Sequence, residues 1–472
     1  MVFLAHAFGQ RYELPLPLLY FVLGGAVVVL VSFLLVLPRP GRALDEPEAH
    51  EETVTGPIRP VPAALGLVLL AGLVAAGIAG SQEVAENIVP TSFWLVLWIA
   101  VPLSCGLLGD WTRPLNPFAS LARLGDSDRV RRVLLGSPQP LGWPGWLGWW
   151  PATVAFFAVA CGELVYNQTA TLPRVTAYGL LVAAMLALAM GMLFGADGWL
   201  RRGEMFSVLF STWGRLGFFR FGAAGRRGFA GGLDAPFEPV ASRLVFVLLL
   251  LVSVSFDGLI STPVWRTARL HIDQLTNGSP AGDDALSASV FLLLTLVTLG
   301  VFGLFAMAVA RAGGRRSTAV ASLCALLPSL LPIAFGYLLA HNLEYLVVNG
   351  QLLIPLLGNP VGLDGWQWLP APFDDTFEVH RNLLPSALYW YVAVVVIVAV
   401  HVVAVVLAHR QLTAAGASPT RARRSEYPWM VAMVAYTMAS LWLLAQPLVQ
   451  DKPASTPTSS AAAPTAHGVW EQ

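Results

Sequence analysis

A carboxylate inside an apolar run is the first feature of this 472-residue chain that points to chemistry. Asp257 lies near the end of RLVFVLLLLVSVSFDGLIS, where inserting a charged side chain into lipid costs about 3 kcal/mol. Ionisable residues at such positions are rare and usually mark functional sites. A second candidate lies in GYLLAHNLEYLVVNGQ, where His341 and Glu344 are three residues apart and therefore share one side of a helix.

Imidazole and carboxylate groups together suit a transition metal such as zinc, manganese, iron or copper. A further histidine, His6, precedes the first apolar run in AHAFGQRYELPLP. We therefore predict a divalent metal site, of undetermined metal, formed by His6, Asp257, His341 and Glu344. A bound divalent ion can activate water for hydrolysis, with Asp257 and Glu344 as the catalytic carboxylates.

Two other interpretations of the same residues remain open, because the sequence contains no HExxH or CxxC motif. In the first, Asp257 caps or breaks its helix ahead of Gly258, and His341 is an interfacial histidine with satisfied hydrogen bonds. In the second, these groups belong to a proton or ion pathway.

Two more histidines lie in AVVVIVAVHVVAVVLAHR. His401 falls deep within the apolar run. It is the candidate cofactor ligand, for haem, or else a proton relay. Haem is the less favoured of these, and a hydrogen bond to a neighbouring helix is the simplest role. His409, beside Arg410, is expected to contact lipid headgroups.

The elements that must position these groups are apolar segments long enough to cross a bilayer, which takes roughly 20 helical residues. With 56% hydrophobic and 12% charged residues, the chain is typical of a membrane protein. We predict an all-α, polytopic bundle with ten spans, at 15–37, 62–80, 92–109, 146–166, 175–196, 242–262, 287–311, 319–346, 386–409 and 428–447.

Arginine is distributed unevenly among the connecting loops. The basic loops are 38–61, 110–145, 197–241, 312–318 and 410–427, whereas the alternate loops carry few basic residues. Because cytoplasmic loops of membrane proteins are enriched in Lys and Arg, we place these five inside and both termini outside the cytoplasm. This orientation puts Asp257, His341, Glu344 and also Glu163 towards the outer side of a cell membrane.

Two basic loops contain apolar residues at helical spacing, within 111–136 and 203–222. We expect these stretches to lie flat on the membrane with their apolar faces in lipid. The polytopic domain is predicted over 1–449, followed by a disordered polar tail at 450–472 that is rich in Pro, Ser, Thr and Ala. A formal net charge of zero gives no reason to expect a nucleic-acid partner, and the bilayer is the expected partner.

Several phrases, including AHAFGQRYELPLP, SVSFDGLISTP, LLAHNLEYLVVNGQLLIPLL and HVVAVVLAHR, resemble a family of bacterial, chiefly actinobacterial, multispanning membrane proteins labelled fenitrothion hydrolase. The resemblance runs from residue 5 to about residue 450. It implies phosphotriester hydrolysis on a small-molecule substrate but assigns no catalytic residue. The alternatives are a transporter or permease for a metal or small solute, and a non-catalytic membrane subunit or assembly factor.

Overall fold

In this computed structural model the described residues are 18–36, 59–221, 228–414 and 418–445, and within them the chain forms helices and no β-strand. A helical segment overlaps each of the ten predicted spans, and the ends of the first and last spans, 15–17, 37 and 446–447, lie outside the described residues. The segments are α1 (Leu18–Val36), α2 (Pro60–Ala79), the continuous α3 (Ile88–Pro90), η1 (Thr91–Ala100) and α4 (Val101–Leu108), α7 (Trp150–Leu164), α9 (Pro173–Phe194), α12 (Ala241–Ile260), α14 (Pro280–Ala312), α15 (Ala319–Asn349), α17 (Ser386–Ala414) and α18 (Pro419–Ala445).

Seven of the described segments are long and apolar enough to cross a membrane. They are α2, the α3–η1–α4 segment, α9, α12, α14, α15 with its extension to Gly358, and α17. Shorter apolar stretches lie in α1, at Val22–Leu34, and in α7. The remaining short elements are α5 (Pro117–Gly125), α6 (Asp128–Leu135), α8 (Asn167–Ala170), α10 (Ala196–Arg202), α11 (Met205–Gly214), η2 (Gly231–Leu233), α13 (Pro263–Leu275), η3 (Gly350–Leu352) and α16 (Leu353–Gly358).

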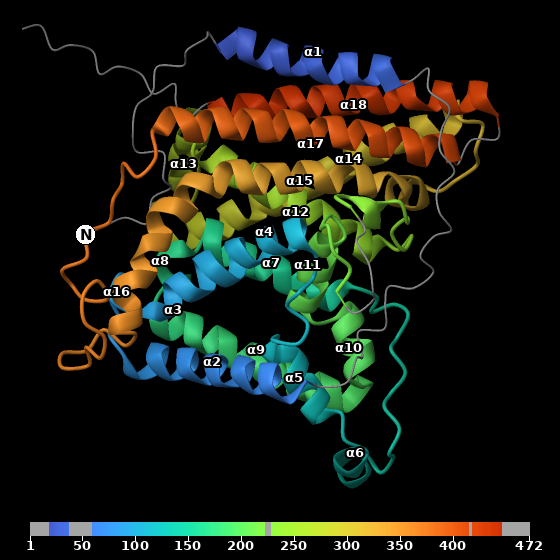
Figure 1. The fold of residues 1–472 in the computed structure, drawn as a ribbon. Coiled ribbons are helices and arrows are strands. Elements are labelled where there is room, and N and C mark those ends of the chain that lie inside the picture. Colours follow the sequence, from blue (N-terminus) through green and yellow to red (C-terminus); the bar gives the residue numbers. More distant parts are fainter. Residues whose placement is uncertain (1–17, 37–58, 222–227, 415–417, 446–472) are drawn as a thin grey trace, which may run out of the picture.

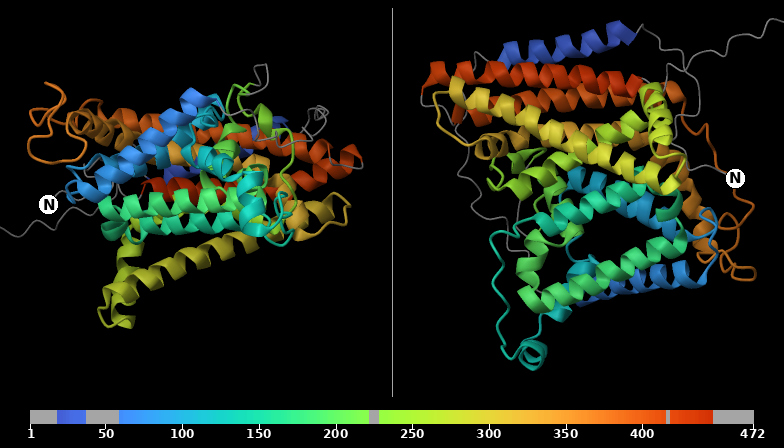
Figure 2. Two further views of the ribbon diagram at one scale, coloured as in Figure 1. Left: turned by 90° about the horizontal axis from the view of Figure 1, so that it is seen from below. Right: turned by 180° about the vertical axis from the view of Figure 1, so that it is seen from behind.

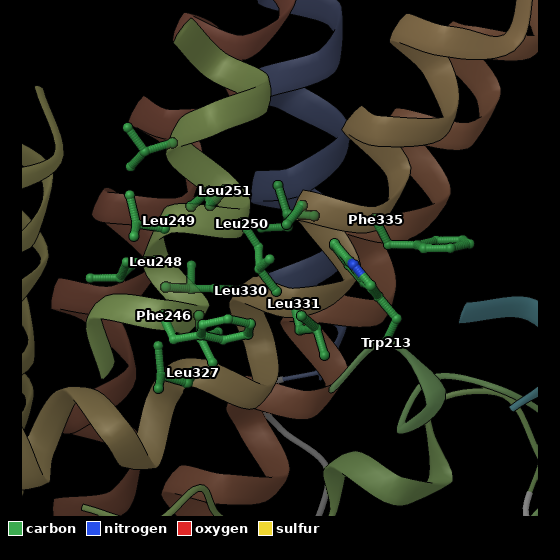
Figure 3. Close-up of a cluster of buried hydrophobic side chains, with 14 of the residues drawn as sticks. Trp213, Phe246, Leu248, Leu249, Leu250, Leu251, Leu327, Leu330, Leu331 and Phe335 are labelled. Atoms are coloured by element: carbon green, nitrogen blue, oxygen red, sulfur yellow. The ribbon is translucent and has the colours of Figure 1, made fainter. Parts of the chain in front are cut away.

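The long helices run side by side, with α1 at one edge of the bundle and the α2–α9 pair at the other (Figures 1 and 2). Helices α12 and α15 are central. In their most apolar stretches 78% and 83% of the residues are buried, against 22% in each of α9 and α14. Figure 3 shows α12 residues, including Phe246 and Leu250, packed against Leu331 of α15, with Trp213 of α11 beside them. Groups carried by α12 and α15 are therefore held in the best-packed part of the molecule.

The described parts of the arginine-rich loops 110–145, 197–241, 312–318 and 410–427 meet at one end of the bundle, called here the basic end. There the Asn116 side chain donates to Glu204 at 3.1 Å, and Arg410 pairs with Asp234 at 2.9 Å. At the opposite end, the amides of Ser81 and Ile88 donate to the carbonyls of Val361 and Pro360. Figure 1 shows α5, α6 and α10 at the first end and α3, α13 and α16 at the second.

The expectation that 203–222 lies flat with its apolar face in lipid is wrong for α11, although Phe218, Phe219 and Phe221 beyond it are exposed. Helix α11 packs inside the bundle, where Phe206, Leu209 and Trp213 are each no more than 3% exposed. Its N-terminus is capped by the Glu204 carboxylate, which accepts hydrogen bonds from the amides of Phe206 and Ser207. The same carboxylate accepts a hydrogen bond of 3.1 Å from the side chain of Asn116, the N-cap of α5, which joins the two helices. The apolar residues of α11 fill a protein core instead of facing the bilayer.

The same correction applies to the first half of 111–136. Phe118 of α5 is 2% exposed and stacks on Phe206 at a centroid distance of 5.4 Å. Only Leu124 and the residues of α6, such as Val133 at 79%, present apolar surface outward. The helical spacing was therefore predicted correctly, but its apolar face lies mainly against other helices.

Candidate functional site

The centre of the candidate site is an ion pair between the two central helices. Nε2 of His341 on α15 lies 2.8 Å from Oδ2 of Asp257 on α12. Both side chains are buried, with relative exposures of 7% and 8%. A buried carboxylate is costly without a partner, and the imidazole supplies a hydrogen-bond donor or, when protonated, an opposite charge.

Local sequence explains why Asp257 lies within a helix. Helix α12 continues to Ile260, one turn beyond Asp257, so the interpretation that Asp257 caps or breaks its helix is wrong. The chain turns later, at Thr262, whose hydroxyl accepts from the amide of Trp265 and starts α13 at Pro263. Asp257 is thus placed by the packing of α12 on α15 and performs no capping role.

A second carboxylate belongs to the same centre. Glu163 of α7 accepts a hydrogen bond of 2.5 Å from the indole N–H of Trp98, and it lies within electrostatic range of both Asp257 and His341. The metal-site prediction omitted Glu163, although Glu163, like Asp257, is an acidic residue inside an apolar segment. It is the one acidic residue in the apolar helix WPATVAFFAVACGEL.

Trp98 is carried by an unusual element. Residues Thr91–Ala100 form the ten-residue π-helix η1, which joins α3 and α4 into one continuous segment. π-Helical turns are rare and occur frequently at functional sites, because the wider turn re-aims its side chains. Here Trp94 donates to the hydroxyl of Thr176, while Trp98 donates to Glu163.

A cavity that is partly open to solvent adjoins these groups, and about 470 Å³ of space, open solvent included, lies between its lining atoms. Its polar lining comes from Glu163, Asp257, Asn342 and Ser253. The remainder of the lining is apolar or aromatic, from η1, α4, α7, α11, α12 and α15: Trp98, Ile99, Pro102, Phe156, Leu164, Leu209, Trp213, Leu250, Val254 and Leu338. Two carboxylates in a largely apolar cavity are a suitable arrangement for acid–base chemistry or for holding a cation.

The predicted metal ligands are only partly brought together. Asp257 and His341 are adjacent, and His6 lies outside the described residues. Glu344 does not line the cavity and instead lies within electrostatic range of Tyr389 on α17. In the described part of the chain, no group of three or more His, Cys, Asp or Glu residues is placed to hold a metal ion.

His401 lies apart from this centre. It is fully buried, and its Nδ1 lies 2.7 Å from the carbonyl oxygen of Ile397 on its own helix. Its Nε2 has no hydrogen-bond partner among the residues described. His401 does not line this cavity. It also does not line a second cavity, at the basic end between α14, α15 and α17. Its role as a cofactor ligand therefore stays a prediction.

The expected headgroup contact of His409 is wrong. His409 is 5% exposed, and its Nδ1 lies 3.1 Å from the carboxylate of Glu426, which is 2% exposed. The pair joins α17 to α18. The neighbouring Arg410 pairs with Asp234 instead, so adjacent residues on α17 contact different parts of the molecule.

Comparison with protein-family models, curated proteins and solved structures finds no match to this chain.

Proposed function

We propose that this chain is a multi-pass protein of the cell membrane with ten spans, with both termini and the Asp257–His341 centre towards the outer side. Two observations support the orientation: the described parts of four of the loops rich in arginine share one end of the bundle, and the centre lies in the halves of α12 and α15 away from that end. Arginine is enriched in cytoplasmic loops, so the basic end is the cytoplasmic one.

This orientation is testable because the native cysteines, Cys105, Cys161 and Cys324, are all buried. A membrane-impermeant maleimide should label Asp364→Cys in intact cells. Ser137→Cys, at the basic end, should be labelled only after permeabilisation. The reverse pattern would invert the proposed topology.

For the centre itself we propose hydrolysis of an uncharged ester of the phosphotriester type, with water activated beside Asp257. The observation that carries this proposal is the adjacency of Asp257, His341 and Glu163 at an apolar cavity. Asp257 would accept a proton from the attacking water, and His341 would hold that carboxylate in place and balance its charge. Trp98, Phe156 and Trp213 supply surface for apolar ester substituents. The fenitrothion hydrolase resemblance agrees with this substrate class.

A divalent transition metal suits the donor types at this centre. Asp257 and His341 would hold it, with Glu163 nearby and the predicted His6 and Glu344 as further candidate ligands. A bound ion would supply hydroxide at neutral pH by lowering the pKa of a water. The described residues provide two adjacent donors, so metal content must be measured.

The test is purification followed by elemental analysis and a p-nitrophenyl phosphotriester assay. Asp257→Asn and Glu163→Gln should each lower the rate strongly, while His271→Gln, an exposed histidine on α13, serves as the matched control. Equal rates in all four proteins would remove the hydrolase proposal. Metal retained by wild type but lost from Asp257→Asn would support the metal site.

A second candidate is transport of a small cation or a proton-coupled solute. The observation that favours it is the extent of the cavity, which runs from Asp257 at the outer half of α12 past Leu250 to Trp213 of α11. A pocket that contains two carboxylates and follows a central helix for two turns can be part of a pathway. Proteoliposome flux that is abolished by Asp257→Asn, together with no hydrolysis by wild type, would select this candidate.

A further inference from the structure

A second cavity lies at the basic end, between α14, α15 and α17, and about 400 Å³ of space, open solvent included, lies between its lining atoms. Its inner wall is apolar, from Ala306, Val309, Ala325, Leu326 and Leu412. Its polar lining consists of Arg315, Ser317, Ser322 and Gln411. Among the described residues, this lining includes a guanidinium and no acidic side chain.

Ser322 is the most informative of these groups. The residue is only 9% exposed, and its hydroxyl oxygen has no hydrogen-bond partner within the described ranges. Most buried serine hydroxyls bond to a carbonyl of their own helix. Ser329, two helical turns further along α15, does so with the carbonyl of Leu326. A buried hydroxyl left without a partner beside a cavity points to a ligand that supplies one.

Arg315 adds charge to the same place. Its Nε is buried and has no hydrogen-bond partner in the part of the chain that the structure describes. Burial lowers the pKa of the Arg315 guanidinium, because removal from water disfavours its charged form. An anion in the cavity would offset that loss of solvation.

The N-terminus of α15 also lies at this cavity. Helix α15 starts at Ala319, with Thr318 as its N-cap, and Ala321 and Ser322 of its first turn line the cavity. The N-terminus of a long helix carries partial positive charge and favours anions, phosphate in particular. The helix end, the unpartnered hydroxyl and the guanidinium thus converge on one small space.

We propose that this cavity binds a phosphate group, presented either by an anionic phospholipid headgroup or by a phosphate-bearing solute. Basic pockets between helices on the cytoplasmic side are typical sites for anionic headgroups. The apolar wall next to the polar groups also suits an amphiphile whose headgroup lies at the level of Arg315. The site is separate from the Asp257–His341 centre and does not depend on the function proposed for it.

The experiment compares wild type with Arg315→Gln and Ser322→Ala, using Arg316→Gln as the matched control because Arg316 is the adjacent, exposed arginine. Each protein is reconstituted in nanodiscs of phosphatidylcholine with or without phosphatidylglycerol, and retained phospholipid is counted by native mass spectrometry. Inorganic phosphate is titrated separately against each protein in detergent, with thermal unfolding as the readout.

We expect Arg315→Gln to weaken binding about tenfold, as loss of a charge-assisted contact does, and Ser322→Ala to weaken it about threefold. Arg316→Gln should remain within about twofold of wild type. Specific retention of phosphatidylglycerol identifies a lipid headgroup, whereas stabilisation by inorganic phosphate alone identifies a soluble ligand.

Either of these two results supports the site, provided that binding weakens in both cavity variants. Binding of neither probe by wild type would overturn the proposal, as would binding that is equal in wild type, Arg315→Gln and Ser322→Ala. Because Ser322→Ala removes one oxygen atom without changing the fold of the helix, it keeps the test decisive if Arg315→Gln fails to fold.

Discussion

Two buried histidine–carboxylate pairs occur among the residues that the structure describes, and they differ in what surrounds them. His341 and Asp257 join α15 to α12, whereas His409 and Glu426 join α17 to α18. The separations are alike, 2.8 and 3.1 Å, and all four residues are under 10% exposed. The first pair adjoins a cavity that also contains Glu163, while His409 and Glu426 line neither of the two cavities described.

The comparison shows that a buried ion pair is not by itself a functional site. Removing charges from water costs several kcal/mol per ion, and a well-formed pair largely offsets that cost without adding much stability. The His409–Glu426 pair is therefore explained as a fixed contact that sets how α18 lies on α17. The Asp257–His341 pair has, in addition, space for a reacting molecule and a second carboxylate beside it.

The largest expected effect separates the two pairs by activity. Asp257→Asn should lower phosphotriester turnover by about 10²–10⁴-fold, the range typical of a lost general base. Glu426→Gln should leave turnover within about twofold, because it keeps a hydrogen-bond acceptor far from the cavity. Steady-state rates of both variants, purified in the same detergent, check this. Similar losses in the two variants would break the distinction.

The next effect concerns stability. Glu426→Ala leaves His409 buried without its partner, so we expect a loss of about 3–5 kcal/mol in the free energy of unfolding. Replacing both residues by alanine should cost less than the sum of the single changes, since the uncompensated group is then gone. Equilibrium unfolding in mixed micelles measures all three variants. An additive double mutant would show that the two side chains do not interact.

A smaller effect tests how the outer centre is held. Trp98→Phe removes the indole donor to Glu163 but keeps an aromatic ring, and leaving a buried acceptor without its donor costs about 1–3 kcal/mol. Turnover should therefore fall by about tenfold. Trp146→Phe is the matched control, because Trp146 is 79% exposed. Unchanged turnover in Trp98→Phe would show that the position of Glu163 does not matter for the reaction.

The smallest effect concerns another buried carboxylate, Glu204, which accepts hydrogen bonds from Asn116 and from backbone amides. Burial raises the pKa of Glu204, and its hydrogen bonds with Ser207, Phe206 and Asn116 oppose that shift only in part. The folded protein therefore holds a proton more tightly than the unfolded chain, so this group's contribution to stability is lost as pH rises above the ordinary glutamate range.

Wild-type stability, measured by chemical unfolding, should thus fall as pH increases through that window. In Glu204→Gln this part of the pH dependence should disappear, because glutamine does not titrate. A pH profile with the same slope in both proteins would contradict the raised pKa.

The positions of the helices could be predicted from the sequence. All ten predicted spans coincide with helical segments, and their ends fall near Pro, Gly and arginine-rich loops. Two local causes explain this success. Apolar segments in lipid must satisfy every backbone polar group internally, which leaves the helix as the favoured form, and the required length follows from bilayer thickness.

The adjacency of Asp257 and His341 was only a hypothesis at the level of sequence, and tertiary structure decided it. Helices α12 and α15 are apolar on nearly all sides, so no stripe in their sequences indicates which side meets which neighbour. Each helix can rotate about its axis without changing its hydropathy, and only packing against real partners selects one rotation.

The same reason accounts for the wrong expectations about α11 and His409. The burial of α11 and the pairing of His409 with Glu426 depend on contacts between segments distant in the chain. So do the hydrogen bond between Trp98 and Glu163 and the position of Glu344 outside the lining of the cavity. The sequence by itself determined the helices, their lengths and the uneven distribution of arginine. The packing of those helices decided which polar side chains meet and which of them adjoin a cavity.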